Sequence, residues 1–147
     1  MTDTWQWMAG RWEGEERIFA TRWGPEGSAR GFIDARIELG GRLLVQEYRA
    51  ERGGQPVLQA HAVFVAEPGR RVALFWFDSY GFVPQEPAPG EWLGEALEVV
   101  RRSPRGQTRH RYTPLEAGSF RLELASSFDQ GASWEPVMQA TYQRIDA

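Results

Sequence analysis

Gly10-Arg11-Trp12 opens the first predicted β-strand of this sequence, and Arg144 closes the last one. Between these points the chain is a succession of runs that alternate in polarity, or are rich in β-branched and aromatic residues, separated by Gly, Pro and Asp. About nine or ten such strands follow one another with short connections and no crossover helix, which favours antiparallel pairing of sequential neighbours. The sequence therefore predicts an all-β fold, a single antiparallel meander β-barrel of about ten strands.

Turn-forming residues set the limits of the predicted strands. Gly40-Gly41 separates two alternating runs and fits a tight hairpin with positive φ. A short helical turn is expected over residues 2–8, ended by Gly10. The strands are expected over residues 12–21, 29–39, 42–52, 57–67, 71–78, 96–103, 107–113, 119–128 and 135–144, with a further short strand near Trp92.

Length and composition bound the class of protein. With 147 residues, 41% of them hydrophobic, we expect a single barrel domain over residues 1–147. The net charge is −3 and the arginines are spread along the chain, so no basic stripe is available to neutralise phosphates. Nucleic acid is therefore not an expected partner.

Two residue types are absent, and each absence excludes chemistry. Without cysteine the chain has no disulfides, thiolate nucleophiles or zinc–thiolate sites. All 17 basic residues are arginine, which excludes Schiff-base chemistry on lysine and a P-loop. No Gly-x-Ser-x-Gly elbow is present either. We expect no catalytic residues and no cofactor.

The N-terminal stretch Met1-Thr2-Asp3-Thr4-Trp5 lacks a basic segment followed by an apolar one, and no apolar run approaches the length of a membrane span. These features predict a cytoplasmic protein that has no membrane partner.

Side-chain alternation separates the inner face of the predicted barrel from its outer face. On the late strands, aromatic and aliphatic residues share one parity, and we expect them to line a cavity for a small apolar or amphipathic ligand. His110 and Tyr112 are the expected polar anchors. The predicted ligand-binding residues are Trp76, His110, Tyr112, Phe120, Leu122, Met138 and Tyr142.

One hairpin carries its own sequence signature. Ser127, Asp129, Gly131 and Trp134 fit the Ser-x-Asp-x-Gly-x-(Ser/Thr)-Trp pattern, called an Asp box. In such a turn the aspartate accepts hydrogen bonds from backbone N–H groups, the glycine takes the left-handed conformation, and the tryptophan packs beneath. A single copy indicates a structural turn rather than a glycan or metal site.

Residues 72–77 are apolar on both faces of their strand, so the outer face needs a cover. The cover could come from the segment of Trp5 and Trp7, from a later loop, or from a second subunit in a homodimer. Residues 79–92 then form the longest irregular stretch. Such a stretch acts as a lid or portal, or as a proline-stiffened connection whose aromatic residues fill a gap.

Several motifs recur in one order along the chain. They are Gly10-x-Trp12-x-Gly14, Gly40-Gly41-Arg42-Leu43-Leu44, Trp76-Phe77-Asp78-Ser79, the Asp box, and Thr141-Tyr142-Gln143-Arg144. Their order and spacing resemble a bacterial lipocalin-like family of unknown function within the calycin barrels, related to nitrobindins and fatty-acid-binding proteins. The resemblance covers nearly the whole chain. It implies a ten-stranded barrel in which the Trp12 indole covers the closed end and the Arg144 guanidinium stacks on it as a structural clasp, and it implies no established activity.

The chain has two histidines, His61 and His110. Nitrobindins bind haem through a histidine late in the chain, and the last strand here carries none. His110 is expected inside the barrel, as a hydrogen-bonded core residue, a haem ligand or a general base. His61 has no assigned face, and the spacing of Glu47 and Asp78 gives no reason to place a metal beside it.

Three hypotheses for function therefore stand. The first is a barrel that carries or senses a small apolar or amphipathic molecule. The second is a haem-binding or catalytic barrel that uses His110. The third is protein association through the face of Phe75 and Phe77 or through Trp76. A helix-grip fold is a distant alternative, because it needs a long C-terminal helix where this chain ends in a strand pattern.

Overall fold

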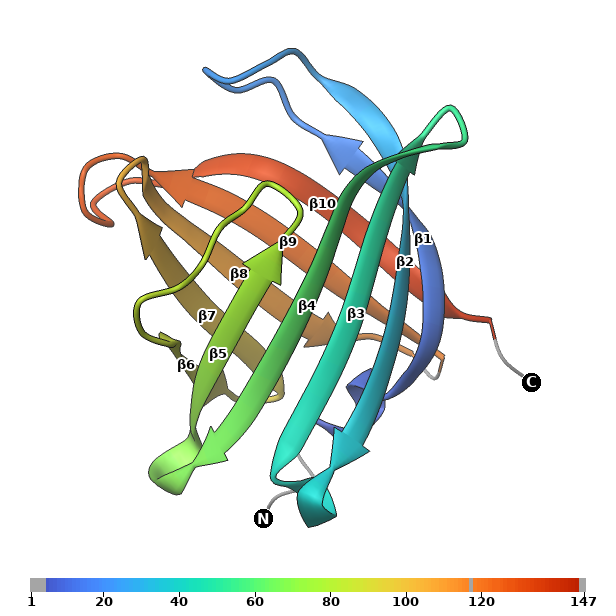
Figure 1. Ribbon diagram of the computed structural model, residues 1–147, viewed down its shortest axis with the longest axis vertical. Helices are drawn as coiled ribbons and strands as arrows, with labels where there is room; N and C mark the ends of the chain where they lie inside the picture. Colours follow the sequence, from blue (N-terminus) through green and yellow to red (C-terminus); the bar gives the residue numbers. More distant parts are fainter. Residues whose placement is uncertain (1–4, 117, 146–147) are drawn as a thin grey trace.

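The computed structural model describes residues 5–116 and 118–145, which form one closed antiparallel sheet (Figure 1). Each strand pairs with its neighbours in the chain, and the last strand pairs with the first, so the predicted meander barrel is confirmed. The strands are β1 (Gly10–Ile18), β2 (Gly27–Glu38), β3 (Leu43–Arg52), β4 (Gln55–Glu67), β5 (Arg71–Asp78), β6 (Ala88–Leu93), β7 (Ala96–Ser103), β8 (Gly106–Pro114), β9 (Ser119–Ser127) and β10 (Glu135–Arg144).

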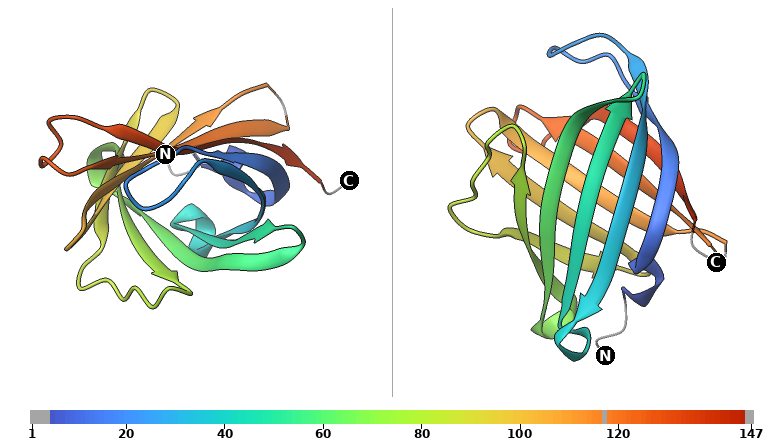
Figure 2. Two further views of the ribbon diagram at one scale, coloured as in Figure 1. Left: turned by 90° about the horizontal axis from the view of Figure 1, so that it is seen from above. Right: turned by 45° about the vertical axis from the view of Figure 1, so that its right-hand side comes forward.

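The strand limits agree closely with the alternation of the sequence. Strands β5, β7 and β10 begin and end where predicted, and the short strand near Trp92 is β6. The main difference is in β1, which ends at Ile18 instead of Thr21, because the β1–β2 hairpin extends beyond the rest of the sheet (Figure 2). The predicted N-terminal turn is the 3-10 helix η1 (Gln6–Met8), and residues 2–4 of that prediction lie outside the described residues.

The register places large and small side chains on opposite parts of the inner face. Pairs such as Gln46–Ala62 and Ala62–Trp76 put inward positions of neighbouring strands side by side. The bulky inward residues come mostly from β5 to β10. Strands β1 to β4 contribute many small inward residues, which are Gly14, Ala29, Gly31, Ala35, Ala50, Ala60 and Ala62.

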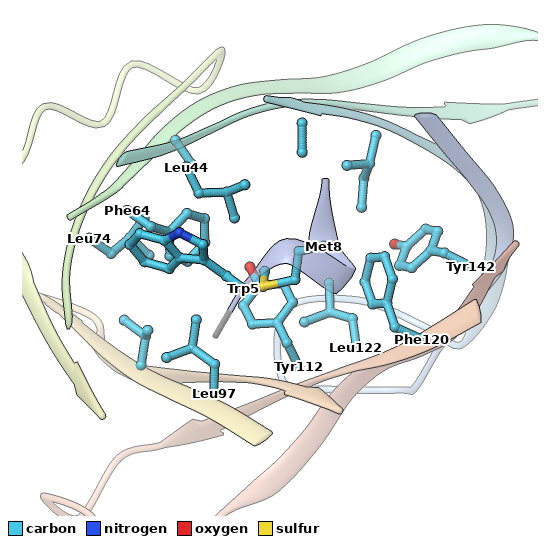
Figure 3. Packing of buried hydrophobic residues seen from close by; sticks show 14 of the residues in the cluster. Trp5, Met8, Leu44, Phe64, Leu74, Leu97, Tyr112, Phe120, Leu122 and Tyr142 are labelled. Carbon is cyan, nitrogen blue, oxygen red and sulfur yellow. The ribbon is translucent and has the colours of Figure 1, made fainter. Parts of the chain in front are cut away.

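The barrel is closed at the end where the chain enters. The η1 turn places Trp5 and Met8 inside this end, where both are buried (Figure 3). Trp5 packs against Phe64 and Trp92, with ring centroids 6.4 Å apart in each pair. We call this the closed end. The opposite, open end carries the loops of residues 19–26, 53–54, 79–87, 104–105 and 128–134.

Strand β5 shows how its two apolar faces are used. Trp76 points into the barrel and is buried, whereas Phe75 and Phe77 point outward. Phe77 is 42% exposed, so part of this outer face has no cover within the described residues. Trp76 is therefore unavailable for association through the outer surface. Among the described residues, no helix has the length and hydropathy needed to cross a membrane.

Candidate functional site

The termini of the barrel meet at the closed end. Trp12 on β1 is the direct register partner of Arg144 on β10. The guanidinium carbon of Arg144 lies 4.3 Å from the centroid of the buried Trp12 ring, and Nη1 donates to the carbonyl oxygen of Ala9 at 2.9 Å. Gly10 has a φ of 126°, and a Cβ on it would collide with the guanidinium. This clasp closes the barrel at the end where β1 begins and β10 ends.

A carboxyl group lies inside the barrel above the closed end. Glu16 is only 1% exposed, and its Oε2 accepts hydrogen bonds from the hydroxyls of Tyr48 and Tyr142, both at 2.6 Å. Burial raises the pKa of Glu16, and the hydrogen bonds from Tyr142 and Tyr48 oppose part of that rise. Gly31 lies against the same carboxyl group, where a Cβ would overlap Oε2.

Glu16→Gln is expected to remove a pH dependence of stability. Because the native pKa of Glu16 is raised above 4.5, the native state binds more protons than the unfolded state from that pH up to the raised value. The wild type therefore loses stability as the pH rises through this window, and the variant does not. Urea unfolding of both proteins from about pH 4 to about pH 8 checks this. The difference in unfolding free energy should shift in favour of the variant as the pH rises, and parallel curves would contradict the assignment.

One buried amide has an unused hydrogen-bonding group. Gln46 on β3 is 2% exposed and points inward beside Ala35 and Ala62. Its Nε2 is a buried side-chain nitrogen without a hydrogen-bond partner among the described residues. A buried donor of this kind is costly unless an acceptor meets it.

A second polar cluster lies on the wall opposite. Arg101 Nε donates to Nε2 of His110 at 2.9 Å, so the proton of the neutral ring lies on Nδ1, which faces the hydroxyl of Tyr112 at 3.4 Å. His110 and Tyr112 are each 1% exposed. Burial first, and the Arg101 charge second, hold the pKa of His110 well below its ordinary value. The neutral His110 ring thus accepts a hydrogen bond from the cationic guanidinium of Arg101.

The barrel wall has a gap beside this cluster. Strand β6 pairs with β5 only as far as Leu74, and with β7 only as far as Val99. Residues 75–78 and 100–103 consequently have no β6 partner between them, and the loop of residues 79–87 covers the opening (Figure 1). A pocket of about 670 Å³ lies beneath this loop, lined by Trp76, Phe82 and Arg101 among others.

The predicted ligand-binding residues all lie on the inner face. Each of the seven is at most 8% exposed, and they come from β5, β8, β9 and β10. Phe120 belongs partly to the closed end, since its ring lies 4.7 Å from that of Trp12. Sequence reasoning missed Glu16, Gln46, Tyr48 and Arg101, although each shares the parity of an inward apolar neighbour.

His61 lies on the outside of the barrel. Its Nδ1 is 2.7 Å from Oε2 of Glu47, and both side chains are nearly half exposed. Within residues 5–116 and 118–145 no group of three or more acidic, histidine or cysteine residues could hold a metal ion. The contact between His61 and Glu47 is an exposed surface hydrogen bond of small energetic weight.

The Asp-box hairpin connects β9 and β10 at the open end. Asp129 accepts hydrogen bonds from the backbone N–H of Ser133 at 2.9 Å and from its hydroxyl at 2.6 Å. The Ser127 hydroxyl donates to Asp129 at 2.8 Å, and Gly131 has a φ of 90°. These hydrogen bonds, those from Ser133 foremost, lower the pKa of Asp129 to about 2. Trp134 packs on the outside of the barrel under the guanidinium of Arg109.

Comparisons with known proteins agree on the fold. No protein-family model and no curated protein sequence matches the chain. Rv2717c from M. tuberculosis has a TM-score of 0.75 at 13% identity, over 97% of this chain and 98% of its own. The S-type phycobiliprotein lyase CPES from Guillardia theta has a TM-score of 0.69 at 8% identity, over 99% and 92%. A protein of unknown function from the DUF3598 family of Nostoc punctiforme has a TM-score of 0.64 at 12% identity, over 95% of this chain and 48% of its own.

These similarities concern the fold. The present chain shares the barrel fold of these solved structures over nearly its whole length. Identities this low establish the fold alone, so the chemistry must be argued from the residues inside this barrel.

Proposed function

We propose that this barrel binds a small apolar or amphipathic molecule in its interior, held by Trp76, Tyr112, Leu122 and Met138 with polar anchors among them. The observation that carries the proposal is the change in burial along the inner face. Near the closed end most inward residues are buried, and Ile37 and Ala66 are the partly exposed exceptions among the inward apolar side chains there. Towards the open end inward residues are partly exposed, as in Ile18, Tyr48, Leu58, Asp78, Arg101, Thr108 and Leu124.

The direction of these side chains explains why their exposure matters. A residue that points into a closed barrel contacts solvent only through the open end, or through the gap between β5 and β7. Partly exposed inward residues such as Leu58 and Leu124 therefore border space that is accessible from outside. Apolar walls with a few polar groups are typical of small-molecule sites.

The polar groups indicate an amphipathic ligand. The unpartnered Nε2 of Gln46 offers a donor, and Glu16 adds a buried carboxyl group whose pKa is raised by burial. Arg101 adds a charge at the edge of the cavity. A similar fold in a phycobiliprotein lyase is compatible with a small ligand here.

Filling the interior is expected to abolish binding of the neutral fluorescent probe N-phenyl-1-naphthylamine. The wild type should bind it saturably. In Ala60→Phe the new ring occupies the inner face, because Ala60 is buried and points inward beside Tyr48. We expect at least about a tenfold loss of affinity, since a filled cavity cannot accept the ring system.

The matched control is Gln59→Phe, which adds the same ring to the outer face of the same strand. Its affinity for the probe should equal that of the wild type. Equal binding by all three proteins would place the probe outside the barrel and refute the proposal, as would the absence of saturable binding to the wild type.

Haem binding through His110 has less support. Arg101 occupies one ring nitrogen, and Tyr112 faces the other. A haem ligated there would need the hydrogen bond from Arg101 to break, and would expose that cation to an apolar macrocycle. The geometry thus favours a structural acceptor role for His110, and a nitrobindin-like activity has no further support in this chain.

Association through the outer face of β5 is a separate proposal. Phe75 and the partly exposed Phe77 are the residues that could meet a second copy, and sedimentation at several concentrations measures it. A cytoplasmic location likewise stays a proposal from the sequence.

A further inference from the structure

We propose that Arg101 binds the carboxylate of an apolar ligand that enters through the gap between β5 and β7. This inference rests on the proposed function and specifies its ligand as an amphiphile with a carboxylate head. The evidence is the unpaired charge of Arg101, its position in the gap, and the character of the pocket beneath the loop of residues 79–87.

Burial lowers the pKa of Arg101, and the nearby carboxylate of Asp78 offsets only part of that effect. The ion pairs formed by the described residues do not include it. Its hydrogen-bond partner is the neutral His110, which orients the guanidinium through Nε without cancelling its charge. No acceptor within the described residues is bound to either terminal nitrogen of Arg101. An arginine can donate hydrogen bonds from two of its guanidinium nitrogens to the two oxygens of one carboxylate.

Asp78, the acid whose charge acts on Arg101, accepts hydrogen bonds from other donors. Asp78 accepts the indole N–H of Trp76 on Oδ2 at 2.9 Å. Its Oδ1 accepts the backbone N–H groups of Tyr80 at 3.0 Å and Phe82 at 3.4 Å. Asp78 thus holds the start of the loop and the Trp76 ring. The other charged residues that line the pocket, Glu86 and Arg102, are exposed.

Arg101 lies where the inner wall of the barrel meets the loop of residues 79–87. The guanidinium carbon lies 4.7 Å from the Trp76 centroid and 5.7 Å from the Phe82 centroid, so the cation lies close to an inner-wall aromatic and a loop aromatic. Beside it the pocket of about 670 Å³ is lined largely by apolar side chains, including Leu74, Val83 and Val100. A carboxylate on Arg101 would leave an apolar tail against these residues.

Paired fluorescent ligands test this inference. The probes are cis-parinaric acid and its methyl ester, which share one polyene chain and differ in the head-group charge. The wild type should bind the acid more tightly than the ester. In Arg101→Gln the acid should bind about 10-fold or more weakly, because a hydrogen bond to a charged group is lost, and the ester should be unaffected. Arg101→Lys keeps the positive charge but cannot donate two parallel hydrogen bonds to one carboxylate, so its loss of affinity for the acid should be intermediate.

The control is Arg121→Gln, which removes the same charge from the outer face of β9 and should leave both affinities unchanged. Circular dichroism establishes that each variant is folded. If acid and ester bind saturably but Arg101→Gln weakens neither, or both equally, the carboxylate site is refuted while interior binding stands. If neither probe binds the wild type, both proposals fail.

Discussion

Trp12→Ala is expected to lower the free energy of unfolding by about 3–5 kcal/mol, the range for truncating a buried aromatic residue. The indole is 1% exposed, and its Nε1 donates to the carbonyl oxygen of Met8 at 3.1 Å. Its ring contacts Phe120 edge to face, at 4.7 Å between centroids. The substitution removes the floor of the barrel and leaves a cavity between β1 and η1. Urea unfolding measures the loss.

The Trp12→Ala and Arg144→Ala double-mutant cycle tests the clasp itself. Because Arg144 is exposed, the coupling energy should be only about 0.5–1 kcal/mol, the range for an exposed cation–π pair. Arg11→Ala, on the outer face of β1, serves as a control without coupling to Trp12. Strictly additive losses for Trp12 and Arg144 would show that their contact contributes nothing to stability.

Gly31→Ala is expected to destabilise the barrel by about 1–3 kcal/mol, as an overpacked core substitution. A Cβ at this inward position would overlap Oε2 of Glu16 and lie 3.1 Å from Cε1 of Tyr142. The carboxyl group cannot easily turn aside, since two tyrosine hydroxyls hold that oxygen. Thermal and urea unfolding measure the effect.

Removing the carboxyl group should rescue the substitution at Gly31. In a Glu16→Ala background, Gly31→Ala should cost less than half of its cost in the wild type, because the overlapping atoms are gone. Gly24→Ala is the control, since no atom lies within 4 Å of its Cβ position and its cost should be close to zero. An unchanged cost in the Glu16→Ala background would mean that the clash lies elsewhere.

Much of the fold follows from local sequence pattern. Alternation and turn residues fix most strand limits within a few residues, because a one-residue slip would turn every core side chain outward. The inward positions of Tyr112, Phe120 and Tyr142 follow from the same parity. The prediction placed the end of β1 at Thr21 instead of Ile18. The β1–β2 hairpin extends beyond the rest of the sheet there, and side-chain alternation does not show where pairing within the sheet stops.

The polar site was less predictable. The run Glu13-Gly14-Glu15-Glu16 reads as a solvated face, yet Glu16 shares the parity of Trp12 and Gly14 and is buried. Parity also places Arg101 inward, two residues after Val99. What no local pattern shows is the gap in the wall, because it arises from β6 being too short to pair along β5 and β7. The position of Arg101 beside the gap between β5 and β7 therefore becomes visible only in the folded barrel.

The central claim is that the barrel interior is a ligand site reached from the open end or the wall gap. Backbone NMR of the protein during titration with N-phenyl-1-naphthylamine tests it most directly. The account predicts saturable shift changes centred on Gln46, Tyr48, Trp76 and Arg101, with little change at the outer-face residues Arg11 and Arg121. Changes confined to outer-face residues, or changes that do not saturate, would contradict it.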